Sequence, residues 1–270
     1  MFFKRSHFVL IFCALLLITT ATSSKAKAFL EIGSNDQHGG QALLLVNSDD
    51  NLGVFGETFE RLPIQIRKNY YGYDKTVIIN GAEFLNDGQL GVVEGKLKKY
   101  AVVDVLLFAH GGPDTYIYLR RSGRHFAISP ETFGTRLKLL KGKLRMVYSS
   151  TCDLDGGLKK LVHASGAAVG VGHHGVNAYP LTFPFKFLRH FKVEGQGAYG
   201  AARAAYYESV YNVNPVMRFI YNPIIEAVFQ NAASEGRPVI SGDKGMSGWD
   251  MVPTATDPRT TVDEIELPAL

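Results

Sequence analysis

One histidine and one cysteine in this chain are placed where they could do chemistry. His110 follows the apolar run Val103–Phe108 and is itself followed by Gly111 and Gly112. Cys152 stands at the end of a second apolar run, "LRMVYSSTC". A thiolate is a strong nucleophile, and an imidazole can give a proton to a leaving amine, so the two groups together suit acyl transfer such as peptide-bond cleavage.

The glycines after the histidine fit the same chemistry. Backbone N–H groups aimed at a carbonyl oxygen stabilise its developing charge by ~3 kcal/mol each in well-studied enzymes. A residue without a Cβ atom lets a substrate backbone approach such an N–H group without a clash. This explains Gly111 and Gly112 better than a packing requirement does.

Strands that alternate with helices must position these residues. The predicted strands are 41–48, 75–80, 103–108, 143–152 and 167–172, and the predicted helices are 52–73 (divided at Pro63), 82–101, 130–140, 157–165 and 197–211. Residues 115–128 read as a hairpin around Ser122 and Gly123. This alternation predicts an α/β fold with a mostly parallel sheet that is covered by helices on both faces.

The carboxyl ends of parallel strands meet at one edge of a sheet, where functional groups gather. Neighbouring strands lie about 4.8 Å apart. If the strands that lead to His110 and Cys152 are neighbours, the imidazole and the thiol come within working distance. The hairpin and one helix account for the chain between them.

In this order the two motifs resemble the caspase-like cysteine peptidases, which include caspases, legumains, gingipains and clostripain. The resemblance is carried by an apolar strand ending in His-Gly and a later one ending in Cys, and it covers roughly Gln41 to Ser209. It implies a three-layer α/β/α sandwich with Cys152 as the nucleophile and His110 as the general acid. It also implies an oxyanion site formed by the backbone N–H groups of Gly111 and Cys152.

The sequence departs from that family after the strand. The caspase pattern "QACRG" and the legumain-like pattern "ACESG" are replaced by "STCDLDGG", with Thr151 before the cysteine. Three functions therefore stay open: a cysteine endopeptidase, a catalytically silent module that binds a partner, and a thiol-dependent hydrolase or transferase of another acyl compound.

Structural interpretations stand beside these functional ones. A cysteine at a strand end is often a small buried side chain, and His110 could simply hydrogen-bond a loop. His173 and His174 are neighbours on a strand, so their rings point to opposite faces and do not favour a metal site. Asp153 and Asp155 either bind a basic substrate side chain or cap the next helix. The residues expected to line the cleft are Gly112, Thr151, Asp153 and one of His173 and His174.

The first 28 residues have the pattern of an export signal. Lys4 and Arg5 precede the apolar stretch Phe8–Thr20, and Ala26-Lys27-Ala28 is a small-x-small cleavage pattern. Thirteen apolar residues are fewer than the ~20 that span a bilayer as a helix. We therefore expect a secreted or periplasmic protein, cleaved near Ala28 and not held in a membrane afterwards. An uncleaved N-terminal anchor is the alternative.

Removing the signal changes the charge and the cysteine content. The signal holds four of the 29 basic residues and no acidic one, so 25 basic residues remain against 25 acidic residues. Without a basic patch, nothing favours nucleic acid as a partner. Cys13 leaves with the signal, and Cys152 then has no partner for an internal disulfide.

Residues 29–252 are expected to form one domain, and 253–270 a polar tail that is mobile or lies along the surface. The expected partner is a peptide or protein substrate. The chemistry needs no metal and no cofactor, and the sequence does not indicate an oligomeric state.

Overall fold

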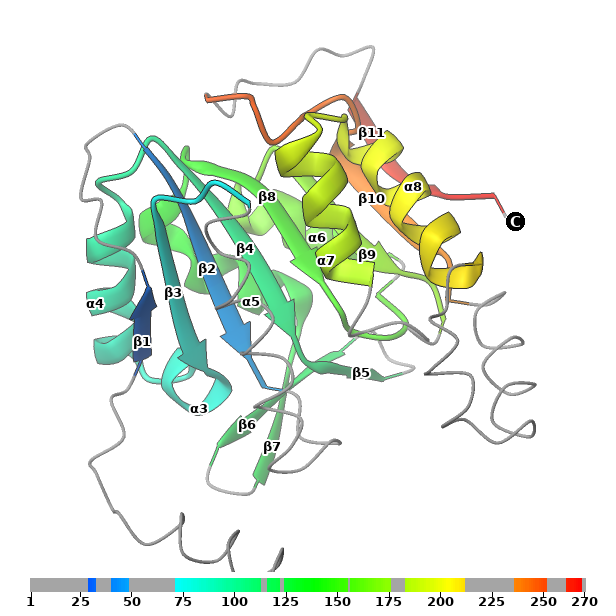
Figure 1. The fold of residues 1–270 in the computed structure, drawn as a ribbon. Coiled ribbons are helices and arrows are strands. Elements are labelled where there is room, and N and C mark those ends of the chain that lie inside the picture. The colour runs from blue at the N-terminus through cyan, green and yellow to red at the C-terminus, as the bar shows by residue number, and fades with distance from the viewer. Residues whose placement is uncertain are drawn as a thin grey trace, which may run out of the picture.

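A computed structural model describes residues 29–32, 40–48, 71–112, 116–121, 124–154, 156–175, 183–211, 236–251 and 261–268. Its main feature is an eight-stranded sheet with the order β1-β3-β2-β4-β8-β9-β10-β11 (Figure 1). In that order the strands are β1 (Phe29–Ile32), β3 (Lys75–Asn80), β2 (Gln41–Asn47), β4 (Val102–Phe108), β8 (Leu144–Ser149), β9 (Val169–His173), β10 (Pro238–Asp243) and β11 (Thr261–Glu266).

The five central strands are parallel, and they are the five that the sequence predicts. The outer strands β1, β10 and β11 are antiparallel to their neighbours. The central strands are buried along most of their length, as expected for strands covered on both faces. The predicted mostly parallel α/β sheet is therefore confirmed.

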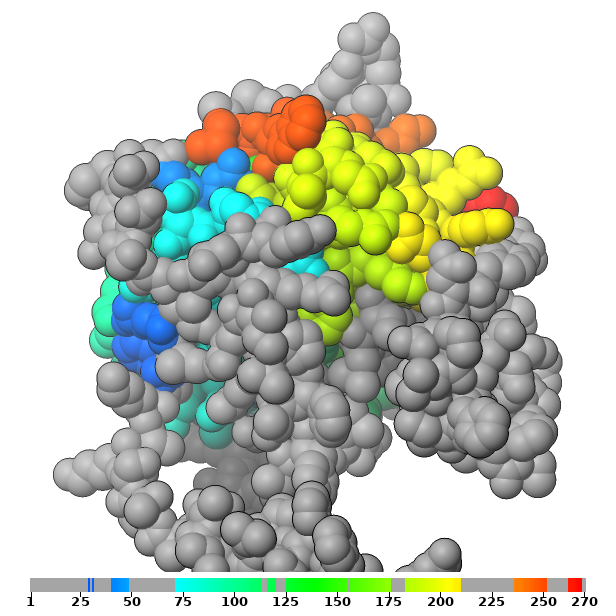
Figure 2. Space-filling model, viewed as in Figure 1, coloured from blue at the N-terminus to red at the C-terminus, as the bar shows by residue number. Residues whose placement is uncertain are grey.

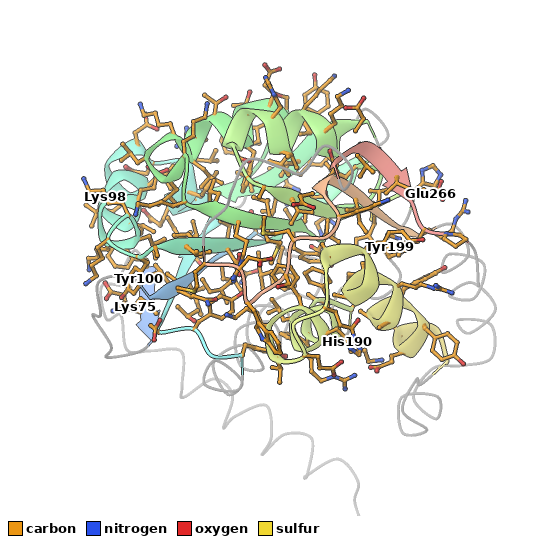
Figure 3. All side chains as sticks on the ribbon, turned by 90° about the horizontal axis from the view of Figure 1, so that it is seen from above. Lys75, Lys98, Tyr100, His190, Tyr199 and Glu266 are labelled. Carbon is orange, nitrogen blue, oxygen red and sulfur yellow. The ribbon has the colours of Figure 1, made fainter. Side chains whose placement is uncertain are left out.

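Helices cover both faces of this sheet, so the molecule has three layers, seen from above in Figure 3. One layer contains α3 (Gly81–Phe84), α4 (Asp87–Leu97), α5 (Pro130–Arg136) and α6 (Gly157–Ser165). The other contains α7 (Phe183–Leu188), the π-helical turn η2 (Arg189–Val193) and α8 (Ala198–Tyr211). Each large apolar side chain buried between layers contributes about 1.5–3 kcal/mol.

Local signals place two helices where the sequence predicts them. The Ser129 hydroxyl accepts the Thr132 N–H at 3.0 Å and begins α5, with Pro130 at the first helical position. Gly166, at φ 73°, ends α6 in the left-handed conformation that glycine adopts without a Cβ penalty. Beneath α6, a Cβ atom on Gly170 would lie only 2.4 Å from a Val162 methyl group, so glycine lets this helix approach the sheet closely.

The single helix expected over 82–101 is divided in two. The Asn86 side chain accepts the N–H groups of Gly88 and Gln89, at 3.0 and 3.3 Å, and so caps the start of α4. The apolar pattern of 82–101 predicts Leu85, Val92, Val93 and Leu97 on one side of a single helix, whereas Val92 is half exposed in α4. A side-chain cap inside an apolar pattern is the physical reason for this difference.

The C-terminal part of the chain also differs from expectation. The tail expected beyond Pro253 contributes β11, which pairs antiparallel with β10 at the sheet edge. Glu264 of β11 accepts the Gly156 N–H at 2.6 Å, at the start of α6. The predicted export signal, residues 1–28, lies outside the described residues. So do residues 52–70 of the helix predicted over 52–73.

A small second sheet stands at the carboxyl ends of the parallel strands (Figure 1). It consists of β5 (His110–Gly112), β6 (Tyr116–Arg121) and β7 (Arg124–Ile128), with β6 and β7 forming the predicted hairpin. Ile117 and Leu119 of β6 are fully buried in the core. Because β6 contacts α3 and α5, this burial holds the hairpin, and with it β5, against the helical layer that covers the main sheet.

The amino ends of the parallel strands are closed by buried charges. Arg145 is the extra residue of a β-bulge in β8, because Val103 and Asp104 pair with Leu144 and Met146. Arg145 and Asp104 are both fully buried and form an ion pair, and Tyr73 donates its hydroxyl hydrogen to Asp104 at 2.6 Å.

The residues that follow β10 lie over these charges, at the top of the molecule in Figure 2, where they are orange. Arg145 donates to the carbonyl oxygens of Gly248 and Asp250 at 2.6 and 2.9 Å. The guanidinium is thus satisfied by backbone oxygens as well as by Asp104, which a buried charge requires.

Candidate active site

The strands that lead to His110 and Cys152 are neighbours. β4 and β8 pair in parallel, and the contact continues past their ends. The Ser150 N–H donates to the Leu107 carbonyl at 2.8 Å, and the Ser150 hydroxyl accepts the Ala109 N–H at 3.3 Å. Ser150 therefore joins the two segments just before each reaches its reactive residue, a role that its sequence position alone did not indicate.

Gly111 lies directly against the backbone of Cys152. An ideal Cβ atom on Gly111 would be 1.9 Å from the Cys152 carbonyl oxygen and 2.9 Å from its nitrogen. Real Cβ atoms do not approach backbone atoms below 3.0 Å, so glycine is required here. The sequence-based reason for Gly111 was the approach of a substrate backbone, and the structure adds this second backbone as a reason.

His110 belongs to the small sheet, where it is directly opposite Tyr118. Side chains of opposed residues share a face, so Tyr118 lies on the face that carries the partly buried imidazole. The Tyr118 ring covers Gly112, whose Cβ position would be 2.7 Å from a ring carbon. Gly112 is accordingly buried, and the expectation that it lines an open cleft is corrected.

Tyr118 is a site residue that the sequence reasoning missed. The alternation in "TYIYLR" could have indicated it. Side chains alternate along a strand, so Tyr116 and Tyr118 lie on the face opposite the buried Ile117 and Leu119. Its pairing partner, however, depends on the register between β5 and β6, which no local pattern reveals.

Cys152 is partly buried, while the residues before it are fully enclosed. Thr151 is not exposed at all, and its hydroxyl is 2.8 Å from the Ser149 hydroxyl. Thr151 therefore does not line the cleft, which corrects that expectation. The structure also accommodates the unusual threonine, because the side chain points into the interior and finds a polar partner there.

His173 is buried on the face of the sheet that α7 covers, and the prediction that it could line the cleft is corrected. Its Nε2 atom is 3.1 Å from the Tyr148 hydroxyl, and its ring packs edge-on against Phe183 at 4.9 Å. Burial lowers its pKa from 6.5 to about 4, so the ring is neutral near pH 7. His174, the next residue, is partly exposed and remains the candidate of this pair.

Asp153 does not cap the following helix. The N-cap of α6 is Gly156, and the N–H of Gly156 is bonded to Glu264 from β11. The Asp153 N–H donates to the Gly175 carbonyl at 2.8 Å, and the Leu154 N–H donates to the His173 carbonyl at 3.0 Å. The loop after Cys152 is thus attached to the end of β9. Asp155 lies outside the described residues.

Metal sites and membrane spans can be addressed for the described part of the chain. No group of three or more His, Cys, Asp or Glu side chains there is arranged to hold a metal ion. No helix in those ranges combines the length and the apolar character needed to cross a bilayer. The apolar stretch Phe8–Thr20 lies outside them.

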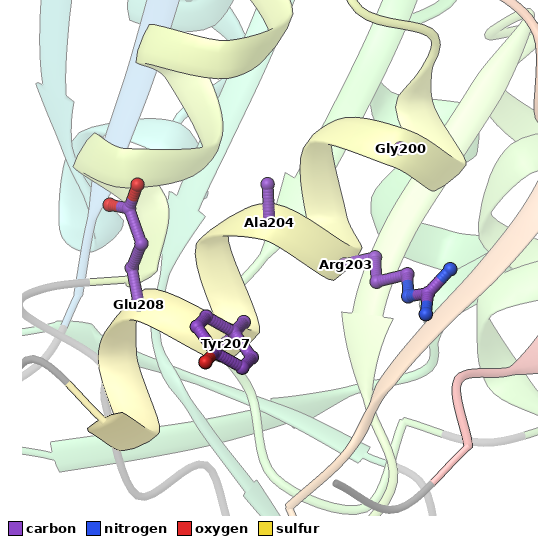
Figure 4. Close-up of a pocket in the computed structure, with 5 residues that line it drawn as sticks. All are labelled: Gly200, Arg203, Ala204, Tyr207 and Glu208. Atoms are coloured by element: carbon purple, nitrogen blue, oxygen red, sulfur yellow. The ribbon is translucent and has the colours of Figure 1, made fainter.

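A pocket of about 440 Å³ is present elsewhere, on α8 (Figure 4). Its lining residues are Gly200, Arg203, Ala204, Tyr207 and Glu208. They lie on one face of a single helix and include no nucleophilic thiol and no imidazole. We therefore place the candidate active site at the strand ends and not in this pocket.

No protein-family model and no curated protein matches the chain. Among solved structures, the fold is similar to a secreted C11 cysteine protease from Bacteroides thetaiotaomicron in complex with an irreversible peptide inhibitor, with 11% identity and a TM-score of 0.48. That match covers 76% of this chain and 66% of the protease, so the chain spans slightly less than two thirds of its length.

The fold is also similar to caspase-1 from Spodoptera frugiperda, with 10% identity, a TM-score of 0.47 and coverage of 78% and 88% of the two chains. Both similarities are similarities of fold alone.

Proposed function

We propose that this chain is an exported cysteine endopeptidase that cleaves peptides or proteins with Cys152 as nucleophile and His110 as general acid. The observation that carries the proposal is the contact between Gly111 and the Cys152 backbone, where a Cβ atom would be 1.9 Å from the carbonyl oxygen. It supports a shared site because Gly111 is the neighbour of His110 and its backbone touches that of Cys152, with no space for a side chain between them.

In the proposed reaction the Cys152 thiolate adds to the scissile carbonyl carbon. The carbonyl oxygen takes up the negative charge, which the N–H groups of Gly111 and Cys152 would stabilise. His110 then gives a proton to the amine, the C–N bond breaks, and an acyl-thioester remains on Cys152. Water hydrolyses the thioester, returning the thiol and releasing the carboxylic acid.

The test is covalent labelling by a peptidyl electrophile, followed by mass analysis of the Cys152 peptide. The wild-type thiol should be labelled at least 100-fold faster than in a His110→Ala variant, the range that a positioned acid or base contributes. Cys152→Ala should take no label at that peptide. His163→Ala, on α6 away from the strand ends, is the matched control and should label like the wild type.

Equal and slow labelling of the wild type and His110→Ala would contradict the proposal and favour a silent binding module. Labelling that depends on His110, without cleavage of any member of a randomised peptide library, would instead favour a hydrolase or transferase of another acyl compound. The same library, if it is cleaved, reports the preferred side chain beside the scissile bond.

Export is proposed on the charge and hydropathy of residues 1–28 and on the position of the first described strand. β1 begins at Phe29 and pairs with Ile79, so cleavage after Ala28 would leave the sheet intact. N-terminal sequencing of the protein recovered outside the cytoplasm should begin at or close to Phe29. A chain that keeps residues 1–28 would contradict the cleavage.

A further inference from the structure

The residue after the candidate nucleophile has an unusual backbone. Asp153 has φ 51°, and in the described part of the chain it is the one residue other than glycine with a positive φ. Cβ clashes disfavour this left-handed region, which asparagine and aspartate tolerate best among residues with a side chain. Backbone conformations of this kind persist only when the surrounding structure holds them, and they gather at functional sites.

Two segments hold the Cys152–Asp153 peptide from opposite sides. On one side, the Cys152 carbonyl oxygen lies against Gly111 of β5. On the other, the Asp153 N–H donates to the Gly175 carbonyl at 2.8 Å. The next residue, Leu154, is buried in the core at 1% exposure and donates its own N–H to His173. The chain therefore changes direction at Asp153, between the contact of Cys152 with Gly111 and the hydrogen bonds to the end of β9.

We propose that Asp153 is a positioning residue whose left-handed backbone, and not its carboxylate, sets the orientation of Cys152. This inference rests on the proposed function. The φ rotation of Asp153 lies between its own N–H, which donates to Gly175, and the Leu154 N–H, which donates to His173, so an extended residue here would break one of these two contacts. The left-handed conformation at Asp153 lets the Cys152 carbonyl lie against Gly111 while the next residue, Leu154, bonds to the end of β9.

A substitution series at this position separates backbone from charge. Asp153→Asn keeps the tolerance for positive φ and removes the charge, and Asp153→Gly removes both the charge and the strain. Asp153→Ala disfavours positive φ, and Asp153→Val disfavours it more because valine is branched at Cβ.

We expect Asn and Gly to keep peptidase kcat/KM within about threefold of wild type. Ala should lower kcat about tenfold and Val about 100-fold, with KM within about twofold, since the effect acts on the position of the nucleophile. If the carboxylate bound the substrate, Asp153→Gly, which has no side chain, would lose activity. Wild-type kcat/KM in this variant therefore distinguishes the two roles.

Two outcomes would overturn the inference. If Asn and Gly lose activity as much as Val, with a raised KM, the carboxylate binds the substrate. If all four variants match the wild type, the backbone at this position does not set the site. Thermal unfolding of each variant shows whether it is folded, and the Ala variant serves where Val does not fold.

A second readout keeps this inference separate from the proposed function. The rate of alkylation of Cys152 by iodoacetamide, followed by peptide mass analysis of the full chain, needs no peptidase activity. Asn and Gly should react at the wild-type rate, while Val should differ from it by at least fivefold. Equal rates across the series would overturn the inference even if the enzyme is active. If the wild type cleaves no peptide but the variants show the expected alkylation rates, only the proposed peptidase function is overturned, and the positioning role of Asp153 stands.

Discussion

At the amino ends of β4 and β8, Asp104 and Arg145 are fully buried and surrounded by partners. At the carboxyl ends, the same two strands lead to His110 and Cys152, which are both only partly buried. One pair of neighbouring strands thus carries a closed polar network at one end and a pair of partly buried reactive residues at the other.

The difference lies in what satisfies the polar groups. The amino edge pairs its charges internally, with Lys192 also buried beside Arg145, where burial and that like charge lower the lysine pKa to about 8. The carboxyl edge uses backbone contacts and glycine to bring two segments together, and it leaves the thiol partly exposed. We infer that the amino edge stabilises the fold and that the carboxyl edge is available for chemistry.

The largest expected effect comes from breaking the amino edge. Asp104→Ala leaves the Arg145 charge buried without its carboxylate, and we expect a loss of about 3–5 kcal/mol in the free energy of unfolding. Denaturant unfolding measures this. Asp263→Ala removes an exposed partner of Lys159 and is the control, with less than about 1 kcal/mol expected. A similar small loss for both variants would contradict a stabilising role of the buried pair.

Gly111→Ala tests the carboxyl edge. The added methyl group would displace the Cys152 backbone, so we expect a stability loss of about 1–3 kcal/mol and an activity loss of about 100-fold. Gly95→Ala on α4 is the matched control, because its Cβ atom would meet nothing within 4 Å. That variant should gain about 0.5–1 kcal/mol from helix propensity. Unchanged labelling of Cys152 in Gly111→Ala would show that the contact is dispensable.

Acid should weaken the carboxyl edge through His173. Burial lowers its pKa to about 4, so the folded state keeps a neutral ring while the unfolded chain is protonated below pH 6.5. The stabilisation is complete above pH 6.5 and is lost as the pH falls towards 4, by up to about 3 kcal/mol. Denaturant unfolding at a series of pH values gives the free energy of unfolding of the wild type and of a His173→Gln variant. The advantage of the wild type over the variant should shrink as the pH falls from 6.5 to 4. A constant difference would exclude the mechanism.

A rise in pH from acid to neutral should weaken the other end of the sheet, near the amino edge, through Glu94 of α4. This carboxyl is 2% exposed, and burial raises its pKa from 4.5 to about 7. The folded state holds the proton that the unfolded chain releases above pH 4.5, so stability falls between pH 4.5 and 7 and then stays level. Glu94→Gln should be about 2 kcal/mol more stable than wild type at pH 8 and similar to it at pH 4. Equal stability at both pH values would count against a buried neutral acid.

The sequence by itself determined the elements that depend on neighbours along the chain. The apolar runs predicted the five parallel strands. The helices predicted over 130–140 and 157–165 begin after Ser129 and end before Gly166, because caps and periodicity act over a few residues. The positions of His110 and Cys152 at two strand ends followed from the same patterns, and with them the candidate chemistry.

Tertiary structure alone decided which groups meet. The bulge that turns Arg145 towards Asp104, the pairing of β10 with β11, the burial of His173 and the capping of α6 by Glu264 all join residues far apart in the chain. The contact of Gly111 with Cys152 is of the same kind. Register and long-range packing decide such contacts, and a local sequence pattern carries no information about either.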